Sequence, residues 1–119
     1  MAHLVLSGVT ATGSSGSIFL SERKSTHTVT CWFTNSNITA LTIRLEGSDE
    51  SRMVTDADAK WYNLHEPHQF TSYEISDKRA MFHITTISPV KRVRINISTL
   101  TGINVNTDTV SAKYEEGTT

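Results

Sequence analysis

The clearest pattern in the chain is an alternation of apolar and polar residues near its C-terminal end. It occurs in residues 90–98 and again in residues 110–115. Successive side chains of a β-strand point to opposite faces, so each run has one apolar face and one polar face. The polar residues between the runs include Gly, Asn and Asp, which are typical of hairpin loops. The pattern therefore predicts a β-hairpin whose apolar face packs against a second layer.

Shorter runs of the same kind recur along the rest of the chain, separated by turns rich in Gly, Ser and Asn. They predict strands over residues 4–12, 17–21, 26–34, 40–46, 61–64, 70–75 and 80–87. Residues 47–60 are polar and acidic and predict a loop with one helical turn, and Pro89 should end a strand. We expect one all-β domain over residues 1–119. It should be an antiparallel β-sandwich, jelly-roll or immunoglobulin-like, of about seven to eight strands, with flexible ends at 1–3 and 116–119.

The alternation also predicts which side chains form the core. These residues share the apolar face of their strands, and they are Val29, Cys31, Phe33, Leu41, Ile43, Leu45, Val93, Ile95, Ile97 and Tyr114. Cys31 is the single cysteine of the chain, so it cannot form an internal disulfide. We interpret it as a buried small apolar side chain.

Composition and charge exclude several classes of partner. Only 37% of the 119 residues are hydrophobic, and Ser and Thr make up roughly a quarter, which suits strands with a wet outer face. The net charge of −1, without a basic run, argues against nucleic-acid binding. No long apolar run predicts a membrane span, and no secretory leader is visible.

The sequence contains no set of residues that predicts catalysis or a cofactor. His65 and His68 flank a bend, but no third and fourth ligand completes a zinc site. Asp49, Asp56 and Asp58 could suit calcium, yet the loop lacks the Gly and final Glu of an EF-hand. No nucleophile motif or Gly-rich phosphate loop occurs. We therefore expect neither enzymatic activity nor a bound metal or cofactor.

Four large side chains are the best candidates for recognition. Alternation places Trp32 on the outer, threonine-rich face of its strand, where it could stack on a sugar, anchor an interface or be covered by another segment. Trp61 is a second candidate for sugar stacking. Arg92 and Arg94 should point outward from their strand, where they would be solvated or would pair across a subunit contact.

The order of the motifs resembles that of small β-sandwich proteins found among the virion structural genes of phages. The resemblance rests on four segments: VTATG at 9–13, LEGSD at 45–49 followed by WYNL at 61–64, PVKRVRINI at 89–97, and LTG at 100–102 with the closing VSAKY at 110–114. The second and third are similar to the family patterns EGS-x-D…W-x-x-L and VKYVRVNV. The loop after Asp49 is longer than the tight turn of the family, and residues 103–108 are additional.

The resemblance implies a non-enzymatic virion protein, and we expect a capsid decoration or cement protein that works as a homo-oligomer, a trimer. Its partner would be the major capsid protein or another virion protein. A tail, neck or fibre accessory protein and a carbohydrate-binding module are the alternatives. The interface residues that we expect lie on the outer face, the N-terminal end and the long loop, and they are Trp32, Arg92, Arg94, Met1, Ala2, His3, Asp49, Glu50, Arg52 and Met53.

Overall fold

A computed structural model describes residues 2–34 and 37–117 of the chain. Its elements are β1 (Ala2–Val9), β2 (Gly13–Ser14), β3 (Ile18–Phe33), β4 (Ala40–Ser48), β5 (Tyr62–Asn63), β6 (His68–Gln69), α1 (Ser72–Asp77), β7 (Arg79–Thr101) and β8 (Val110–Glu116). All pairings among the strands are antiparallel. The strands form one curled sheet in the order β1-β8-β3-β7-β4-β5, with β2 beside β7 and β6 beside β4.

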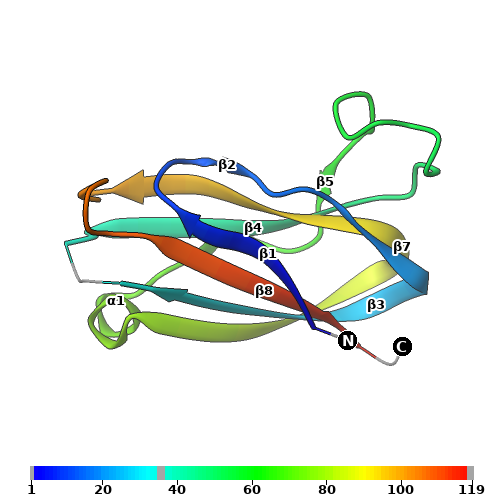
Figure 1. Ribbon diagram of the computed structural model, residues 1–119. Coiled ribbons are helices and arrows are strands. Elements are labelled where there is room, and N and C mark those ends of the chain that lie inside the picture. The colour runs from blue at the N-terminus through cyan, green and yellow to red at the C-terminus, as the bar shows by residue number, and fades with distance from the viewer. Residues whose placement is uncertain (1, 35–36, 118–119) are drawn as a thin grey trace.

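Two long strands, β3 and β7, shape this sheet because both continue from one side of the molecule into the other (Figure 1). Their mutual register shifts twice, between Phe19 and Lys24 and between Lys24 and Thr26, where the sheet bends. The sequence predicted a separate pair of strands for each of them, and Pro89 does not end β7. The all-β antiparallel prediction is confirmed, but the strands belong to one curled sheet, so a two-sheet sandwich is not confirmed.

The core lies on the inner side of the curl. All ten side chains predicted to be buried have 4% or less of their surface exposed, which confirms the period of two as the guide to the core. Leu6, Leu20, Ile38, Phe70 and Ile84 are also buried among the described residues. These residues come from opposite sides of the bend, so the inner face needs both halves of β3 and β7 to close.

The helix α1 corrects the strand predicted over residues 70–75. Thr71 accepts a hydrogen bond from the backbone N–H of Glu74, and the Glu74 side chain accepts one from the Thr71 N–H, which together form a capping box. Lys78 ends the helix in the left-handed conformation, with φ of 63°. No helix in the described part of the chain is long and apolar enough to cross a bilayer.

Both ends of the described chain are paired in strands rather than extending as free tails. Ala2 and His3 lie opposite Glu115 and Tyr114 in β8. Glu116 lies opposite His27, and the Gly117 N–H donates to the Thr26 carbonyl. Met1, Thr118 and Thr119 of the expected flexible ends lie outside the described residues.

Candidate interaction surface

The outward side of β1, β8, β3 and the first half of β7, which we call the outer face, presents one continuous row of side chains. Leu4 lies opposite Lys113, Lys113 opposite Thr30, and Thr30 opposite Met81. Residues directly opposite each other in antiparallel strands point to the same side of the sheet. The row therefore crosses four strands, with an apolar side chain at each end.

Trp32 stands in the next row of the outer face, opposite Ser111 on one side and Arg79 on the other. The exposed fractions of Leu4, Trp32 and Met81 are 61%, 38% and 64%. The position of Trp32 agrees with the alternation in the sequence. Leu4 and Met81 were not singled out there, because their exposure depends on which strands lie beside them.

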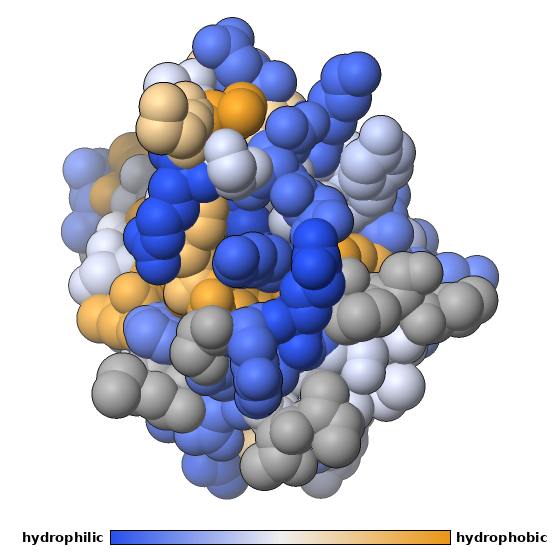
Figure 2. All heavy atoms as spheres, turned by 90° about the vertical axis from the view of Figure 1, so that its right-hand side faces the viewer, coloured by the Kyte–Doolittle hydropathy of each residue, from blue (hydrophilic) through white to orange (hydrophobic). Residues whose placement is uncertain are grey.

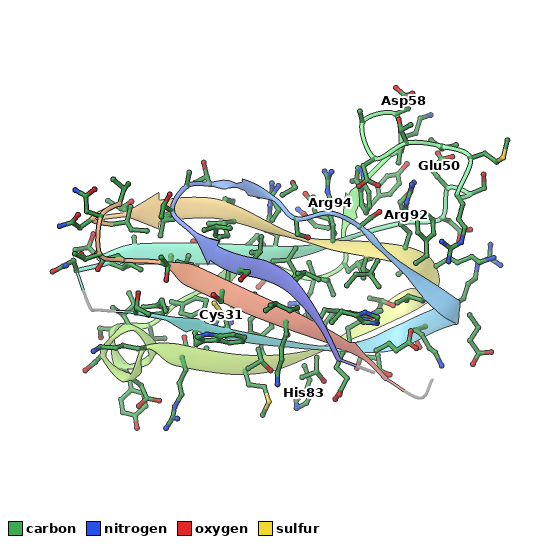
Figure 3. All side chains as sticks on the ribbon, viewed as in Figure 1. Cys31, Glu50, Asp58, His83, Arg92 and Arg94 are labelled. Carbon is green, nitrogen blue, oxygen red and sulfur yellow. The ribbon has the colours of Figure 1, made fainter. Side chains whose placement is uncertain are left out.

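Polar side chains complete the outer face. The row beyond Met81 contains Thr28 and His83, whose Oγ1 and Nδ1 atoms are 2.8 Å apart in a hydrogen bond. Figure 3 shows His83 on the side of the molecule opposite to Arg92 and Arg94. The outer face is thus mainly polar, with three large apolar side chains in it.

Arg92 is buried, with 2% of its surface exposed, so the expectation of a solvated or subunit-pairing side chain there is wrong. It points to the outward side of β7, as alternation requires, but residues 49–61 cover it. Its Nη2 donates to the Val54 carbonyl at 2.5 Å and lies 3.3 Å from the Asp56 carboxylate. Its central carbon lies 4.4 Å from the ring centroid of Phe19. Arg92 therefore anchors the loop of residues 49–61 to β7, and we call these contacts the loop anchor.

Arg94 and Trp61 extend this loop anchor along β7. The Arg94 guanidinium carbon lies 4.2 Å from the Trp61 ring centroid, and Arg94 Nε donates to Glu46 Oε1 at 2.8 Å. The Trp61 Nε1–H donates to the Asp56 carbonyl at 3.0 Å. Trp61 is half-buried in these contacts, so it is a structural side chain rather than a free platform for sugar stacking.

A second anchor lies where the loop leaves β4. Arg23 donates two hydrogen bonds to the Asp49 carboxylate, at 2.9 and 2.8 Å, and these bonds lower the pKa of that carboxyl. The guanidinium of Arg52 lies over the Phe19 ring at 4.3 Å from its centroid. Met53, by contrast, has 92% of its surface exposed and contacts solvent at the loop tip.

The expected interface residues do not form one surface. Trp32 belongs to the outer face, while Glu50, labelled in Figure 3, lies on the loop at the other side of the molecule. The end at which β3 and β7 bend is covered largely by hydrophilic residues, with smaller hydrophobic areas between them (Figure 2). His3 is half-buried in β1, and Met1 lies outside the described residues. The structure thus separates two regions that the sequence had grouped.

His68 and Asp56, two of the residues considered for metals, have other partners. His68 Nε2 contacts the Glu74 carboxylate at 3.0 Å, and its ring stacks on Phe82. Asp56 accepts a hydrogen bond from the Ser17 hydroxyl at 2.7 Å. Among residues 2–34 and 37–117, no three His, Cys, Asp or Glu side chains are grouped so that they could hold a metal ion.

His27 and Cys31 are titratable side chains that lie buried in the core. The Nδ1 atom of His27 is 2.5 Å from the Tyr114 hydroxyl, and burial lowers the pKa of the His27 imidazole to about 4. Burial, with a smaller contribution from Glu74, raises the pKa of the Cys31 thiol to about 12. The alternation of residues 27–33 places His27 on the inner face with Val29 and Cys31, and this signal could have identified it.

Comparison with known proteins identifies a structure with a similar fold but no matching family. No family model matches the chain, and no curated protein matches it. The SPBc2 prophage-derived protein YomS aligns over 98% of this chain and 92% of its own, with a TM-score of 0.55 and 10% identity. The CBM22-1 xylan-binding domain of Paenibacillus barcinonensis Xyn10C aligns over 97% and 78%, with a TM-score of 0.42 and 6% identity. The chain therefore shares the overall β fold of a prophage-derived protein.

Proposed function

We propose that this chain is a non-enzymatic structural protein of a phage particle, a decoration protein that binds the capsid through the outer face. The proposal rests on one observation. The exposed side chains of Leu4, Trp32 and Met81 lie on the same face of four neighbouring, paired strands. Large apolar side chains within a polar rim are the usual anatomy of a protein interface. The prophage origin of YomS, which has a similar fold, supports a phage context.

Decoration suits a small domain because many weak contacts act together on a lattice. Each copy would contribute one modest interface with the major capsid protein, and a homo-oligomer would link several such contacts. Met53, in the loop between β4 and β5, is another exposed apolar side chain, and it could contact a neighbouring molecule. The protein would be made in the host cytoplasm and reside on the virion.

The test is co-sedimentation of the purified protein with undecorated heads and, separately, with tails. Wild type should sediment with heads, and a Trp32→Ala, Met81→Thr double variant should lose most of this binding because the apolar centre of the face is removed. Tyr62→Ala is the matched control, since Tyr62 is 64% exposed on β5 and not on the outer face. Binding to tails alone would make the protein a tail accessory, and binding to neither would defeat the proposal.

A carbohydrate-binding role is the second candidate, because the exposed Trp32 lies on a mainly polar face between Ser111 and Arg79. Its test is a Trp61→Phe variant, in which Trp32 is the one remaining tryptophan of the chain. A saturable change in its fluorescence with host-surface polysaccharide, without binding to heads, would favour this role. An unchanged spectrum together with head binding would exclude it.

A further inference from the structure

The first half of β7 forms an edge of the sheet. Residues 79–85 pair with residues 26–32 of β3 at every position, without a register shift. On the other side of β7, the described strands β2 and β4 pair only with residues from Arg92 onward. Within the described chain, residues 79–85 therefore have a strand neighbour on one side and none on the other (Figure 1).

The backbone groups on the open side can be assigned from one hydrogen bond. The Lys78 carbonyl accepts from the Phe33 N–H at 3.0 Å, so it points toward β3. The carbonyl and the following N–H of a trans peptide point in opposite directions, so the Arg79 N–H points away from β3. Along an antiparallel strand the direction alternates, which places the N–H and C=O groups of residues 79, 81, 83 and 85 at the open edge.

This edge differs from the edge at the other end of the sheet. β1 carries two register irregularities against β8 and a left-handed Gly8, with φ of 63°, and such bulges hinder pairing with another strand. The edge of β7 has a regular register and no proline in residues 79–85. A regular, proline-free edge of this kind is a template for an additional strand.

We propose that this edge pairs with the same edge of a second copy of the chain, antiparallel and around a two-fold axis at Phe82. Met81 would then lie opposite His83 of the second copy, and Arg79 opposite Thr85 of the second copy. In this register residues 79, 81, 83 and 85 of each copy form both of their backbone hydrogen bonds with the other copy. A shift of the register by one hydrogen-bonded pair would leave some of these backbone groups unpaired.

The side chains of the edge are compatible with this self-pairing. The two Arg79 side chains would lie six residues apart along the strands, about 20 Å, so no like charges are opposed. A two-fold contact requires a surface that is its own complement, and this register provides one. A three-fold ring would instead require the edge of β7 to pair with a different edge, and the irregular β1 is poorly suited to that. The proposed two-fold contact is an alternative to the trimer expected from the sequence.

Pairing would join the outer faces of the two copies into one surface. Met81 and Trp32 lie on β7 and β3, the two strands next to the axis, so each dimer would present two sets of apolar anchors side by side. The self-pairing does not depend on the proposed capsid function. If that function holds, the dimer doubles the contacts of each docking event.

Amide hydrogen exchange followed by NMR tests the pairing on the unmodified protein. Residues 80, 82 and 84 bond to β3 and should be protected at every protein concentration. The amides of residues 79, 81, 83 and 85 should exchange fast in dilute protein and become protected as concentration rises, in step with a monomer–dimer change in sedimentation velocity. If the amides of residues 79, 81, 83 and 85 stay unprotected in concentrated protein, the proposal is overturned. The edge would then be available to pair with a strand of another protein.

A pair of variants at one position isolates the backbone contribution. His83→Pro removes an N–H that faces the open edge, and His83→Thr removes the same side chain but keeps the N–H. We expect the proline variant to weaken dimerisation about tenfold or more relative to the threonine variant, since two hydrogen bonds are lost per dimer. Protection of residues 80, 82 and 84 verifies that each variant is folded. Equal dimerisation of the two variants, or a trimer in the wild type, would overturn the two-fold edge contact.

Head binding is measured separately, so the two proposals can fail independently. A wild type that dimerises through β7 but does not sediment with heads would retain the edge contact and defeat the decoration role. A monomeric protein that binds heads would do the reverse.

Discussion

The guanidinium of Arg94 lies over the ring of Trp61, with its central carbon 4.2 Å from the centroid of the indole. The two residues are 33 positions apart in the sequence and come from β7 and from the end of the long loop. Their contact continues through Arg92 to Phe19 and Arg52, so cations and aromatic rings alternate across this side of the molecule. Such contacts contribute about 0.5–2 kcal/mol each, depending on how far they are desolvated.

Trp61→Ala should therefore loosen the loop and lower the free energy of unfolding by about 2 kcal/mol, because it removes a half-buried ring and its cation contacts. Urea unfolding gives the stability, and limited trypsin digestion at Arg52 and Lys60 reports the loop. Tyr62→Ala is the control, because its exposed ring should cost no more than about 0.5 kcal/mol. Equal protease resistance of Trp61→Ala and wild type would contradict the role of the loop anchor.

Stability should fall as the pH drops below about 6.5, because His27 is buried as the neutral imidazole. Its pKa is about 4 in the folded protein and 6.5 as the ordinary value, so the unfolded chain takes up the proton first. The contribution is complete above pH 6.5 and is lost toward pH 4, at up to about 1.4 kcal/mol per pH unit. Urea unfolding between pH 7 and 5, where most carboxylates stay ionised, measures the slope.

The matched variants for this slope are His27→Gln and His65→Gln. The first should flatten the pH dependence, whatever its effect on overall stability, and the second should keep it because His65 is exposed. A slope that survives in His27→Gln would assign the pH dependence to other groups.

The thiol of Cys31 should resist alkylation in the native protein at pH 8. It is fully buried, and its pKa of about 12 leaves very little thiolate at that pH. Mass spectrometry after a short exposure to iodoacetamide should show no adduct in native protein and complete labelling in urea. Rapid native labelling would mean that the inner face of β3 opens readily.

Gly102→Ala should destabilise the turn after β7 by about 2 kcal/mol. Gly102 has φ of +83°, and a Cβ atom there would lie 2.7 Å from the Asn37 carbonyl oxygen. Gly16→Ala is the control, because no atom lies within 4 Å of its would-be Cβ. The melting temperature should fall for the first variant and stay or rise slightly for the second. A neutral Gly102→Ala would show that this turn adapts without strain.

Local patterns in the sequence were sufficient for two features of this molecule. The period of two identified the inner side chains of β3, β4 and β7 and placed Trp32 on the outer face, because the direction of a side chain depends only on its own strand. Thr71 and Glu74 have the spacing of a capping box, so the sequence also contained a signal for α1. The short apolar run at residues 70–75 predicted a strand there instead.

Other features depend on which segments meet, and only the tertiary structure decided them. Arg92 and Val54 are 38 positions apart, and the hydrogen bond between them turns an expected surface arginine into a buried loop anchor. The bends that make two predicted pairs of strands into β3 and β7 arise from register shifts between those strands. The open edge at residues 79–85 exists because β4 pairs only with the second half of β7. A strand's alternation fixes its two faces but not its neighbours, since pairing is a long-range choice made by the whole core.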